Sequence, residues 1–279
     1  MRICFTSDFH GDPARYQELG RLLRDARPDL VILGGDMFAD GADPDPAGDQ
    51  AATAQRLLTE QIAAWRRDLP ALAVGCLTGN HDWLATEAAL RRLEDAGLLR
   101  LLDPTRPWHL GGLTLLGFPY TPPTPHWLKD YERLDLPGDE LIDFGLPELW
   151  ATGPDGPGVV DEAEYFYSRS ALEQMLAELP TPSGPWILIA HAPPHDSALD
   201  RLPGVEHPIG SRAVRRFIAE RRPTAALHGH VHESPEVTGR FVDTIAGVPC
   251  INPGQSHERL YAVVFDSDDI SGSVRHTEL

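Results

Sequence analysis

Short, unbroken apolar runs stand out along the chain and predict buried strands. The runs are partly β-branched, as expected for strands that are covered on both faces. Helical stretches alternate with the first three runs, and two further stretches precede the fourth and the fifth. This alternation favours an α/β layering. The five apolar runs are Arg2–Thr6, Leu30–Leu33, Leu72–Leu77, Trp186–Ala190 and Ala225–Leu227.

The first helical stretch has a recognisable starting point. Asp12 is typical of an N-cap, and Pro13 is typical of the first helical turn. A helix that opens there should continue to about Arg27. The other predicted helices span about residues 47–67, 86–96, 168–179 and 211–222.

The pattern in the rest of the chain predicts a mixed sheet. Residues 108–118, with Gly111 and Gly112 at their centre, are typical of a hairpin with a tight glycine turn. The tail after about residue 266 is expected to be a loose terminus. Three shorter strands, joined by turns, are predicted at 240–246, 249–252 and 261–265.

One long segment, at about residues 119–169, breaks the alternation. It is rich in proline and aromatic residues and contains the acidic run KDYERLDLPGDE. A connection this long is uncommon in a compact domain unless it is a lid or a binding loop. We therefore expect a single domain over residues 1–279 with a lid-like insertion. A lid, a docking surface for a partner and plain packing onto the core are all compatible with this composition.

The net charge narrows the class of partner. The 279 residues carry a formal charge of −18, so the acidic surface repels polyphosphate backbones and disfavours duplex nucleic acid. Bound divalent cations would offset part of this charge locally. A small phosphorylated substrate is therefore compatible with the acidic net charge.

The cysteines and the apolar runs indicate the cellular compartment of the protein. The three cysteines form no CxxC pair, which is typical of small buried residues in a reducing environment. The first residues do not resemble a signal peptide, and no apolar run approaches the length of a bilayer span. We expect a cytoplasmic protein with no membrane partner.

Each of the five apolar runs is followed within a few residues by side chains that bind metals. The carboxyl edge of an open α/β sheet is where ligands bind, so these side chains should converge there. Carboxylate, amide and imidazole donors without a thiolate suit Mn, Fe, Co, Ni or Zn. Seven ligands are natural for two metals about 3.5–4 Å apart that share a carboxylate. The candidate ligands are Asp8, His10, Asp36, Asn80, His191, His230 and His232.

The order of these motifs resembles that of a known family. DxH, GGD, GNHD, a strand-ending His and GHxH, between Asp8 and His232, resemble the signature of the calcineurin-like metallophosphoesterases. The flanking HAPPH, GSRAVRRFI and INPG are similar to small prokaryotic members related to cyclic-nucleotide phosphodiesterases. This resemblance implies a four-layer α/β/β/α sandwich, with two mixed β-sheets and helices on the outer faces.

The resemblance also implies a role for each motif. Asp36 would bridge two divalent metal ions, and manganese is the favoured metal. A hydroxide shared by the ions would attack phosphorus, and His81 would be the general acid that protonates the leaving oxygen. The first ion would be held by Asp8, His10 and His232, and the second by Asn80, His191 and His230.

The chain departs from the family pattern at one position. Several branches of the family have an Asp three residues beyond the bridging Asp, where it supports the catalytic His; this chain has Ala39 there. Asp40 and Asp82 are the candidates to replace it. Asp82 is equally suited to cap the helix that begins near Thr86.

Four further residues are candidates for contact with substrate or for support of the ligands. His228 is expected to make a supporting hydrogen bond instead of binding a metal. His195 is a candidate substrate contact, with a solvated loop position as the alternative. Arg212 is a candidate phosphate contact at a helix N-terminus, whereas Asn252 either orients a site residue or forms a plain turn.

These patterns together predict a hydrolase of phosphoric esters, and the resemblance to the phosphodiesterase-related members alone implies a preference for phosphodiesters. A phosphomonoesterase or nucleotide phosphatase of the same family is the main alternative. A nuclease should show a basic groove, which the acidic composition disfavours. A non-catalytic scaffold should have lost a ligand or His81, and the sequence keeps them all.

Overall fold

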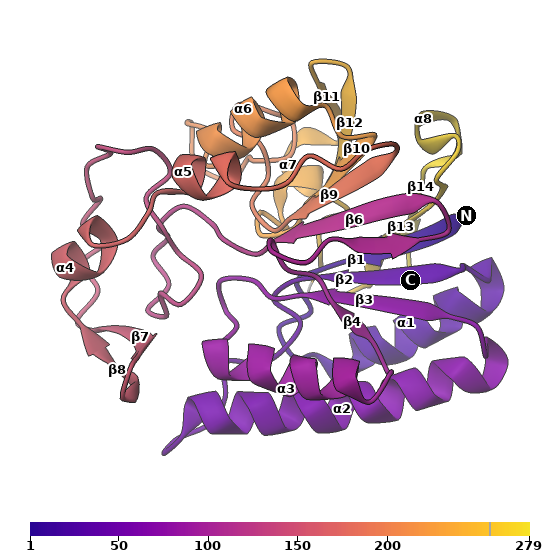
Figure 1. The fold of residues 1–279 in the computed structure, drawn as a ribbon, viewed down its shortest axis with the longest axis horizontal. Coiled ribbons are helices and arrows are strands. Elements are labelled where there is room, and N and C mark those ends of the chain that lie inside the picture. The colour runs from indigo at the N-terminus through magenta and orange to yellow at the C-terminus, as the bar shows by residue number, and fades with distance from the viewer. Residues whose placement is uncertain (257) are drawn as a thin grey trace.

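Two six-stranded mixed sheets form the centre of the molecule (Figure 1), whose computed structural model describes residues 1–256 and 258–279. The strand order of the first sheet is β14 (Arg275–Glu278), β13 (Tyr261–Asp266), β1 (Arg2–Thr6), β2 (Leu30–Gly34), β3 (Ala73–Leu77) and β4 (Arg100–Leu101). The strand order of the second sheet is β11 (Val242–Ile245), β12 (Val248–Ile251), β10 (Ala225–Leu227), β9 (Trp186–Ala190), β6 (Leu113–Phe118) and β5 (Trp108–Leu110).

Helices cover the outer face of each sheet, so the predicted four-layer α/β/β/α sandwich is confirmed. One apolar cluster joins the first sheet to its helices, a second joins the second sheet to its helices, and a third lies between the sheets. The helices on the first sheet are α1 (Pro13–Ala26), α2 (Pro46–Asp68) and α3 (Leu84–Asp95). Those on the second sheet are α5 (Leu172–Ala177) and α6 (Arg212–Arg221).

The alternation of side chains along each central strand explains why the strands look uniformly apolar in sequence. In β2, Leu30 and Ile32 pack between the sheets, whereas Val31 and Leu33 pack against the helices. Successive side chains of a strand point to opposite faces, and here both faces are covered. All five predicted core strands are present, and β1, β9 and β10 have the predicted bounds.

Two predictions about the ends of elements were wrong. The helix expected over residues 168–179 is shortened to α5, because Leu172 N and Glu173 N donate to Leu134 O and Asp135 O instead of continuing a helix backwards. The tail after residue 266 is ordered instead of loose. It forms α8 (Ile270–Ser273) and β14, which pairs with β13, and Ile270 is buried between the sheets.

The insertion lies in the crossover between the neighbouring parallel strands β6 and β9, at one end of the sandwich (left in Figure 1). It contains a two-stranded hairpin of β7 (Leu149–Gly153) and β8 (Gly156–Val160), followed by α4 (Glu162–Tyr167). A small apolar cluster of its own, around Tyr165 and Phe166, gives it internal packing. One more short helix, α7 (Ser234–Thr238), follows β10.

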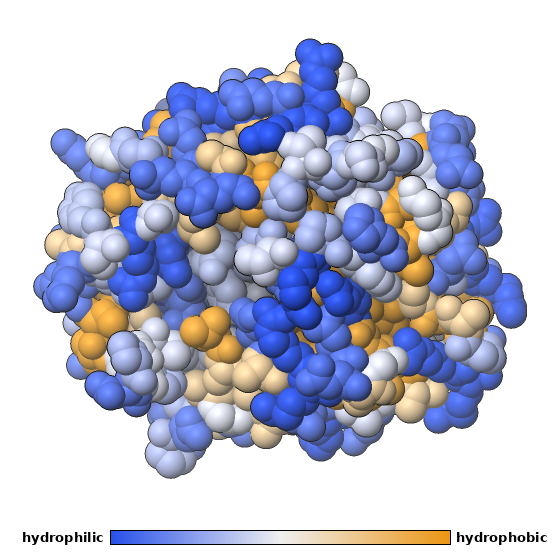
Figure 2. Space-filling view, viewed as in Figure 1, coloured by the Kyte–Doolittle hydropathy of each residue, from blue (hydrophilic) through white to orange (hydrophobic). Residues whose placement is uncertain are grey.

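One face of the molecular surface shows how polar and apolar side chains are distributed. The face shown in Figure 2 is largely hydrophilic, and apolar side chains appear on it as separate small areas. Within the described residues, no helix has both the length and the apolarity needed to cross a membrane.

Candidate metal centre

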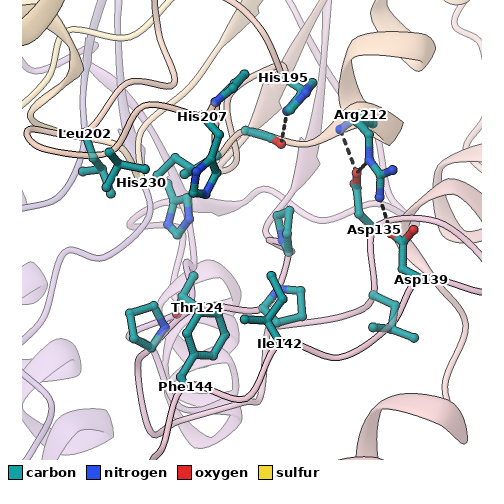
Figure 3. A pocket seen from close by; sticks show the side chains of 18 of the residues that line it. Thr124, Asp135, Asp139, Ile142, Phe144, His195, Leu202, His207, Arg212 and His230 are labelled. Atoms are coloured by element: carbon teal, nitrogen blue, oxygen red, sulfur yellow. Dashed lines mark hydrogen bonds and ion pairs between the residues drawn. The ribbon is translucent and has the colours of Figure 1, made fainter.

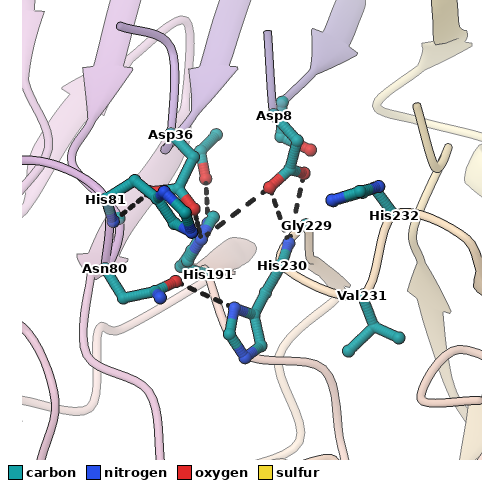
Figure 4. A network of polar contacts seen from close by, with 12 residues as sticks. Asp8, Asp36, Asn80, His81, His191, Gly229, His230, Val231 and His232 are labelled. Carbon is teal, nitrogen blue, oxygen red and sulfur yellow. Dashed lines mark hydrogen bonds and ion pairs between the residues drawn. The ribbon is translucent and has the colours of Figure 1, made fainter. Parts of the chain in front are cut away.

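The ends of β1, β2, β3, β9 and β10 bring the seven predicted ligands to one place (Figure 4). His191 Nε2 lies 3.1 Å from Asp36 Oδ2 and 3.9 Å from Asp8 Oδ1. His230 Nδ1 lies 2.9 Å from Asn80 Oδ1. Residues from both sheets therefore share a single centre, in which His191 faces both carboxylates.

Two groups of three ligand atoms, each group within 4.8 Å, have Asp36 in common. One group is Asp36, His191 and His230, and the other is Asp36, His10 and His81. Among the described residues, Asp8 and His232 belong to neither group. His232 is nevertheless adjacent, because its ring centroid is 5.5 Å from that of His10. Asp36 thus occupies the middle of the cluster.

Backbone conformation holds four of the predicted ligands in unusual positions. Asp8, His10, Asp36 and His230 have positive φ angles of 59°, 46°, 53° and 66°. Left-handed conformations cost energy for residues other than glycine and persist where the surroundings impose them. The loops after β1 and β2 hold each other, since Asp8 N donates to the carbonyl of Gly35 and His10 N to that of Asp36. Strain is therefore concentrated at the ligands.

Glycines make room for these close approaches. A Cβ atom on Gly79 would lie 2.3 Å from Asp36 Oδ1 and 2.6 Å from His191 Nε2. A Cβ atom on Gly229 would lie 2.5 Å from Asp8 Oδ2. These distances are below any normal contact, so a larger residue at either position would displace a carboxylate.

The electrostatics of the centre favour a bound cation. Asp8 and Asp36 are both buried, although burial penalises a charged carboxylate. Burial raises the pKa of Asp36, but His191 and His81 outweigh burial and hold this pKa well below its usual range. Conversely, burial lowers the pKa of His191, and the charges of Asp36 and Asp8 outweigh burial and raise it to about 9.

One buried nitrogen points to the same conclusion. His191 Nδ1 is hydrogen-bonded to the carbonyl of Gly34 at 2.9 Å, whereas Nε2 faces Asp36 Oδ2 at 3.1 Å but has hydrogen-bond geometry with no described residue. A buried polar atom without a partner calls for an explanation such as an ion. Two buried carboxylates, an amide oxygen and imidazoles are also the donors that divalent transition metals accept. The residues present therefore fit divalent metal ions.

Asp40 fills the gap that Ala39 leaves beside His81. His81 Nδ1 lies 3.2 Å from Asp40 Oδ1. Burial lowers the pKa of His81, but the charges of Asp36 and Asp40 outweigh burial and raise it to about 9. The carboxylate that contacts the candidate acid therefore comes from the next residue along the chain.

Asp82 has a different task, and its interpretation as a helix cap was wrong. Its side chain is fully buried and accepts from the backbone N–H groups of Gly79 at 2.8 Å and Asp36 at 3.2 Å. Burial and the charge of Asp36 raise the pKa of Asp82 to about 8. Its Oδ2 atom thus joins the loops that follow β2 and β3, while the first N–H of α3, on Leu84, donates to Asp130.

The insertion supplies two residues to the centre that sequence reasoning missed. The ring of His126 stacks on that of His81, with centroids 3.7 Å apart and planes at 27°. Burial lowers the pKa of His126 to about 4. Glu132 Oε1 accepts from Asn80 Nδ2 at 3.4 Å, which leaves the amide oxygen facing His230. Both contacts join residues more than 40 positions apart, so no local motif could signal them.

Glu132 is held in turn by a buried ion pair. Lys129 Nζ lies 2.6 Å from Glu132 Oε2, and both side chains are almost completely buried. The hydroxyl of Thr124 also donates to Glu132. Burial raises the pKa of Glu132, and the attraction of Lys129 opposes this effect. The acidic run of the insertion is therefore partly an interior structure.

His228 and Asn252 hold the loops that carry ligands. His228 Nδ1 donates to the carbonyls of Ala190 at 3.0 Å and Ala192 at 2.9 Å, the residues on either side of His191. Burial lowers the pKa of His228 to about 4, so the ring is neutral at pH 7. Asn252 Nδ2 donates to two carbonyl groups of the GHxH loop, at Gly229 and Val231.

Arg212 does not offer a free phosphate site, and this prediction was wrong. The helix N-terminus beside it is occupied by Asp135 of the insertion, which accepts from Ser211 Oγ at 2.5 Å and Arg212 N at 2.8 Å. The Arg212 guanidinium is paired with Asp135 and Asp139. The carboxylate of Asp135 thus occupies the position where a phosphate was expected. His195 lies nearby and contacts the Gly210 carbonyl.

The family profile of the calcineurin-like phosphoesterases matches residues 1–234. The chain belongs to this family. It is therefore a metallophosphoesterase, a hydrolase of phosphoric esters, and the family uses divalent metal ions of the kind that the centre fits. The family acts on small phosphorylated substrates.

Solved structures agree on the fold of this metallophosphoesterase. A protein of known crystal structure superposes with a TM-score of 0.65 at 16% identity, covering 99% of this chain and 98% of that one. The protein TT1561 of Thermus thermophilus superposes with a TM-score of 0.56 at 16% identity, with the same coverage. At this identity the likeness concerns the fold alone. No curated protein matches the chain significantly.

Proposed function

We propose that this metallophosphoesterase hydrolyses phosphodiesters at a dinuclear centre, with His81 as general acid. The observation that carries the proposal is the placement of Asp36, which is common to two separate groups of candidate ligand atoms. A carboxylate in that position suits a bridge between two ions. His81 lies at the edge of the same cluster, where its ring centroid is 4.7 Å from that of His10.

Seven side chains would hold the two ions. Divalent ions, when bound, offset the charge of a phosphate group and lower the pKa of coordinated water. Manganese is our first choice among Mn, Fe, Co, Ni and Zn, which all suit carboxylate, amide and imidazole donors without thiolate. The first set of ligands is Asp8, His10 and His232, the second is Asn80, His191 and His230, and Asp36 is shared.

His81 is suited to deliver a proton to the leaving oxygen. Asp40 engages Nδ1, so Nε2 is the ring nitrogen that can meet a substrate. The stacked ring of His126 fixes the plane in which His81 lies. A positioned imidazole accelerates such a step by about 10²- to 10⁴-fold.

The preference for diesters rests on resemblance. The segments HAPPH, GSRAVRRFI and INPG resemble those of small prokaryotic members related to cyclic-nucleotide phosphodiesterases. The net charge of −18 disfavours long nucleic acids as substrates. We also propose a cytoplasmic location, because the three cysteines are buried and unpaired, as is usual in a reducing compartment.

A substrate panel tests the proposal. Bis-p-nitrophenyl phosphate, p-nitrophenyl phosphate, cyclic nucleotides and nucleotide sugars are each assayed with Mn, Ni, Zn or no added metal. We expect metal-dependent hydrolysis, fastest for a diester with Mn. Faster cleavage of p-nitrophenyl phosphate than of every diester would favour a phosphomonoesterase instead. A metal-loaded protein that cleaves none of these compounds would overturn the proposal.

A further inference from the structure

A cavity of about 490 Å³ lies beside the metal centre, between the insertion and the loop that precedes α6 (Figure 3). Figure 3 shows Thr124, Ile142 and Phe144 of the insertion on one side and His195 and His207 of the loop on the other. His230, a predicted ligand of the second ion, borders the cavity. The cavity is therefore continuous with the site of the chemistry.

The walls of this cavity are mainly apolar. Ile142 is 63% exposed to solvent, although a large aliphatic side chain gains from burial. Leu202, Val205 and Phe144 are also only partly buried where they line the same space. Apolar walls with few polar groups, at this volume, are typical of sites for organic ligands.

The arginine that lines the cavity is paired within the protein. Arg212 is paired with Asp135 and Asp139, so its charge is already balanced. Glu140 adds a further negative charge to the lining. The negative charge of Glu140 would repel an additional phosphate or carboxylate of the ligand, whereas the apolar side chains of the walls would pack against an uncharged apolar group.

A second cavity, of about 400 Å³, borders other residues of the centre and is lined mainly by polar side chains. Its lining includes Asp8, His10, His81 and His232. The candidate acid thus lines the polar cavity and not the apolar one. The acid must meet the departing oxygen, so the leaving group belongs on the polar side. The second ester group of a diester, which stays on phosphorus, is then directed to the apolar side.

We propose that the apolar cavity binds the ester group that remains on phosphorus, and that this group is uncharged and apolar, either aryl or alkyl. This inference rests on the proposed function and specifies its substrate class. A water molecule adds to phosphorus, the bond to the leaving oxygen breaks, that oxygen takes a proton from His81, and the product is a monoester that carries the apolar group. A monoester substrate would leave the cavity empty, which gives diesters an advantage.

A series of p-nitrophenyl phosphate diesters tests the proposal, with methyl, propyl, butyl or phenyl as the second ester group. All members release the same p-nitrophenolate, so only the retained group varies. We expect kcat/KM of the Mn-loaded enzyme to rise roughly fourfold for each added methylene that the cavity buries. A carboxypropyl ester should be a poorer substrate than the butyl ester.

A pair of matched variants connects the effect to the cavity. Ile142→Asp should lower the ratio of kcat/KM for the phenyl ester over the methyl ester by at least about fivefold, because it places a charge in the apolar wall. Val159→Asp is the control: Val159 is also an exposed aliphatic residue of the insertion, 56% exposed, but does not line the cavity. This control should keep the wild-type ratio.

The outcomes separate the two proposals. If no diester is cleaved, the proposed function fails. Equal kcat/KM for the methyl and phenyl esters would leave the hydrolase standing and overturn the apolar subsite. An unchanged phenyl-to-methyl ratio in Ile142→Asp would also overturn it, because the selectivity would then arise elsewhere.

Discussion

The loops that carry the predicted ligands are held by hydrogen bonds between their own backbones and by core side chains such as Asp82 and Asn252. The insertion is held mainly by acidic side chains that contact neighbouring elements. Asp8 and Asp36 adopt left-handed conformations that hydrogen bonds between neighbouring loops maintain. The insertion instead uses three acidic residues at different points. Asp130 accepts from the first turn of α3, Glu132 accepts from Asn80, and Asp135 accepts from the start of α6.

The difference teaches that ligand binding and ligand support are divided between two parts of the molecule. Residues on the loops would touch the metal directly, and residues of the insertion would act through them. Partners behind a ligand typically change metal affinity by about 10- to 100-fold, which is less than the loss of the ligand itself. Substitutions in the two regions should therefore have effects of different sizes.

The largest effect is expected at the shared carboxylate. Asp36→Asn removes the negative charge common to both ligand groups while it keeps a residue that tolerates positive φ. We expect metal content to fall and kcat/KM for the preferred diester to drop by at least about 10³-fold. Metal analysis by mass spectrometry and steady-state kinetics check this together. Full metal content with wild-type activity would contradict a bridging role.

A large effect on turnover alone is expected at His81. His81→Ala should lower kcat by about 10²- to 10⁴-fold and leave the metal content unchanged. The leaving group provides the control, because p-nitrophenolate needs little protonation whereas an alkoxide needs it fully. The loss should therefore be smaller for p-nitrophenyl esters than for alkyl diesters. An equal loss for both would point away from acid catalysis.

The insertion is tested through its buried ion pair. Glu132→Gln alone leaves Lys129 buried without its counter-charge, which should lower the free energy of unfolding by about 3–5 kcal/mol. Lys129→Met combined with Glu132→Leu should restore much of that stability. The double variant should still bind metal about 10- to 100-fold more weakly, because Asn80 loses its partner. Denaturant unfolding and metal titration separate the two effects, and wild-type metal affinity would show that Glu132 supports only the fold.

A smaller effect is expected at Asp40. Asp40→Asn removes the charge beside His81 and should lower kcat by roughly tenfold, since a hydrogen bond to a charged group contributes about 1.5–3 kcal/mol at most and Asp40 is partly exposed. The pH profile provides an independent check. The pKa of His81 in the metal-free protein, followed by NMR, should fall from about 9 because one of its negative neighbours is lost. An unchanged pKa would mean that Asp36 alone sets it.

The effect with the smallest consequence for activity concerns acid stability. Burial lowers the pKa of His228 to about 4 from 6.5, so between these values the unfolded chain binds a proton that the folded chain does not. The free energy of unfolding of the metal-free protein should therefore fall as the pH falls through this window, by roughly 2–3 kcal/mol from this residue. His228→Asn keeps an N–H donor and should reduce the fall. His109→Asn, on the exposed β5 strand, is the control, and a loss of the same slope there would exclude His228 as its source.

The sequence predicted the core strands and the ligand positions because both are encoded locally. A strand covered on both faces is apolar throughout, and each ligand follows its strand within a few residues. Glu132, His126 and Asp135 could not be predicted in the same way, because each acts on a residue 45 or more positions away. Strand β4 was not predicted because a strand of two residues shows no periodicity. The prediction of a loose tail was wrong because the pairing of β14 with β13 has no local sequence signal.

The crossover between β6 and β9 gives the fold a place where sequence can change freely. β6 and β9 are parallel, so the connection leaves the sheet after Phe118 and re-enters it at Trp186, at the opposite edge, and the sheet fixes both ends whatever the length of the connection. Doubling a flexible connection costs only about 0.6 kcal/mol in closure entropy. Descendants of a common ancestor could therefore exchange this whole module and acquire new substrates while the catalytic platform is inherited intact. The same exchange offers a route to grafted variants, provided that the incoming module carries a carboxylate for Asn80.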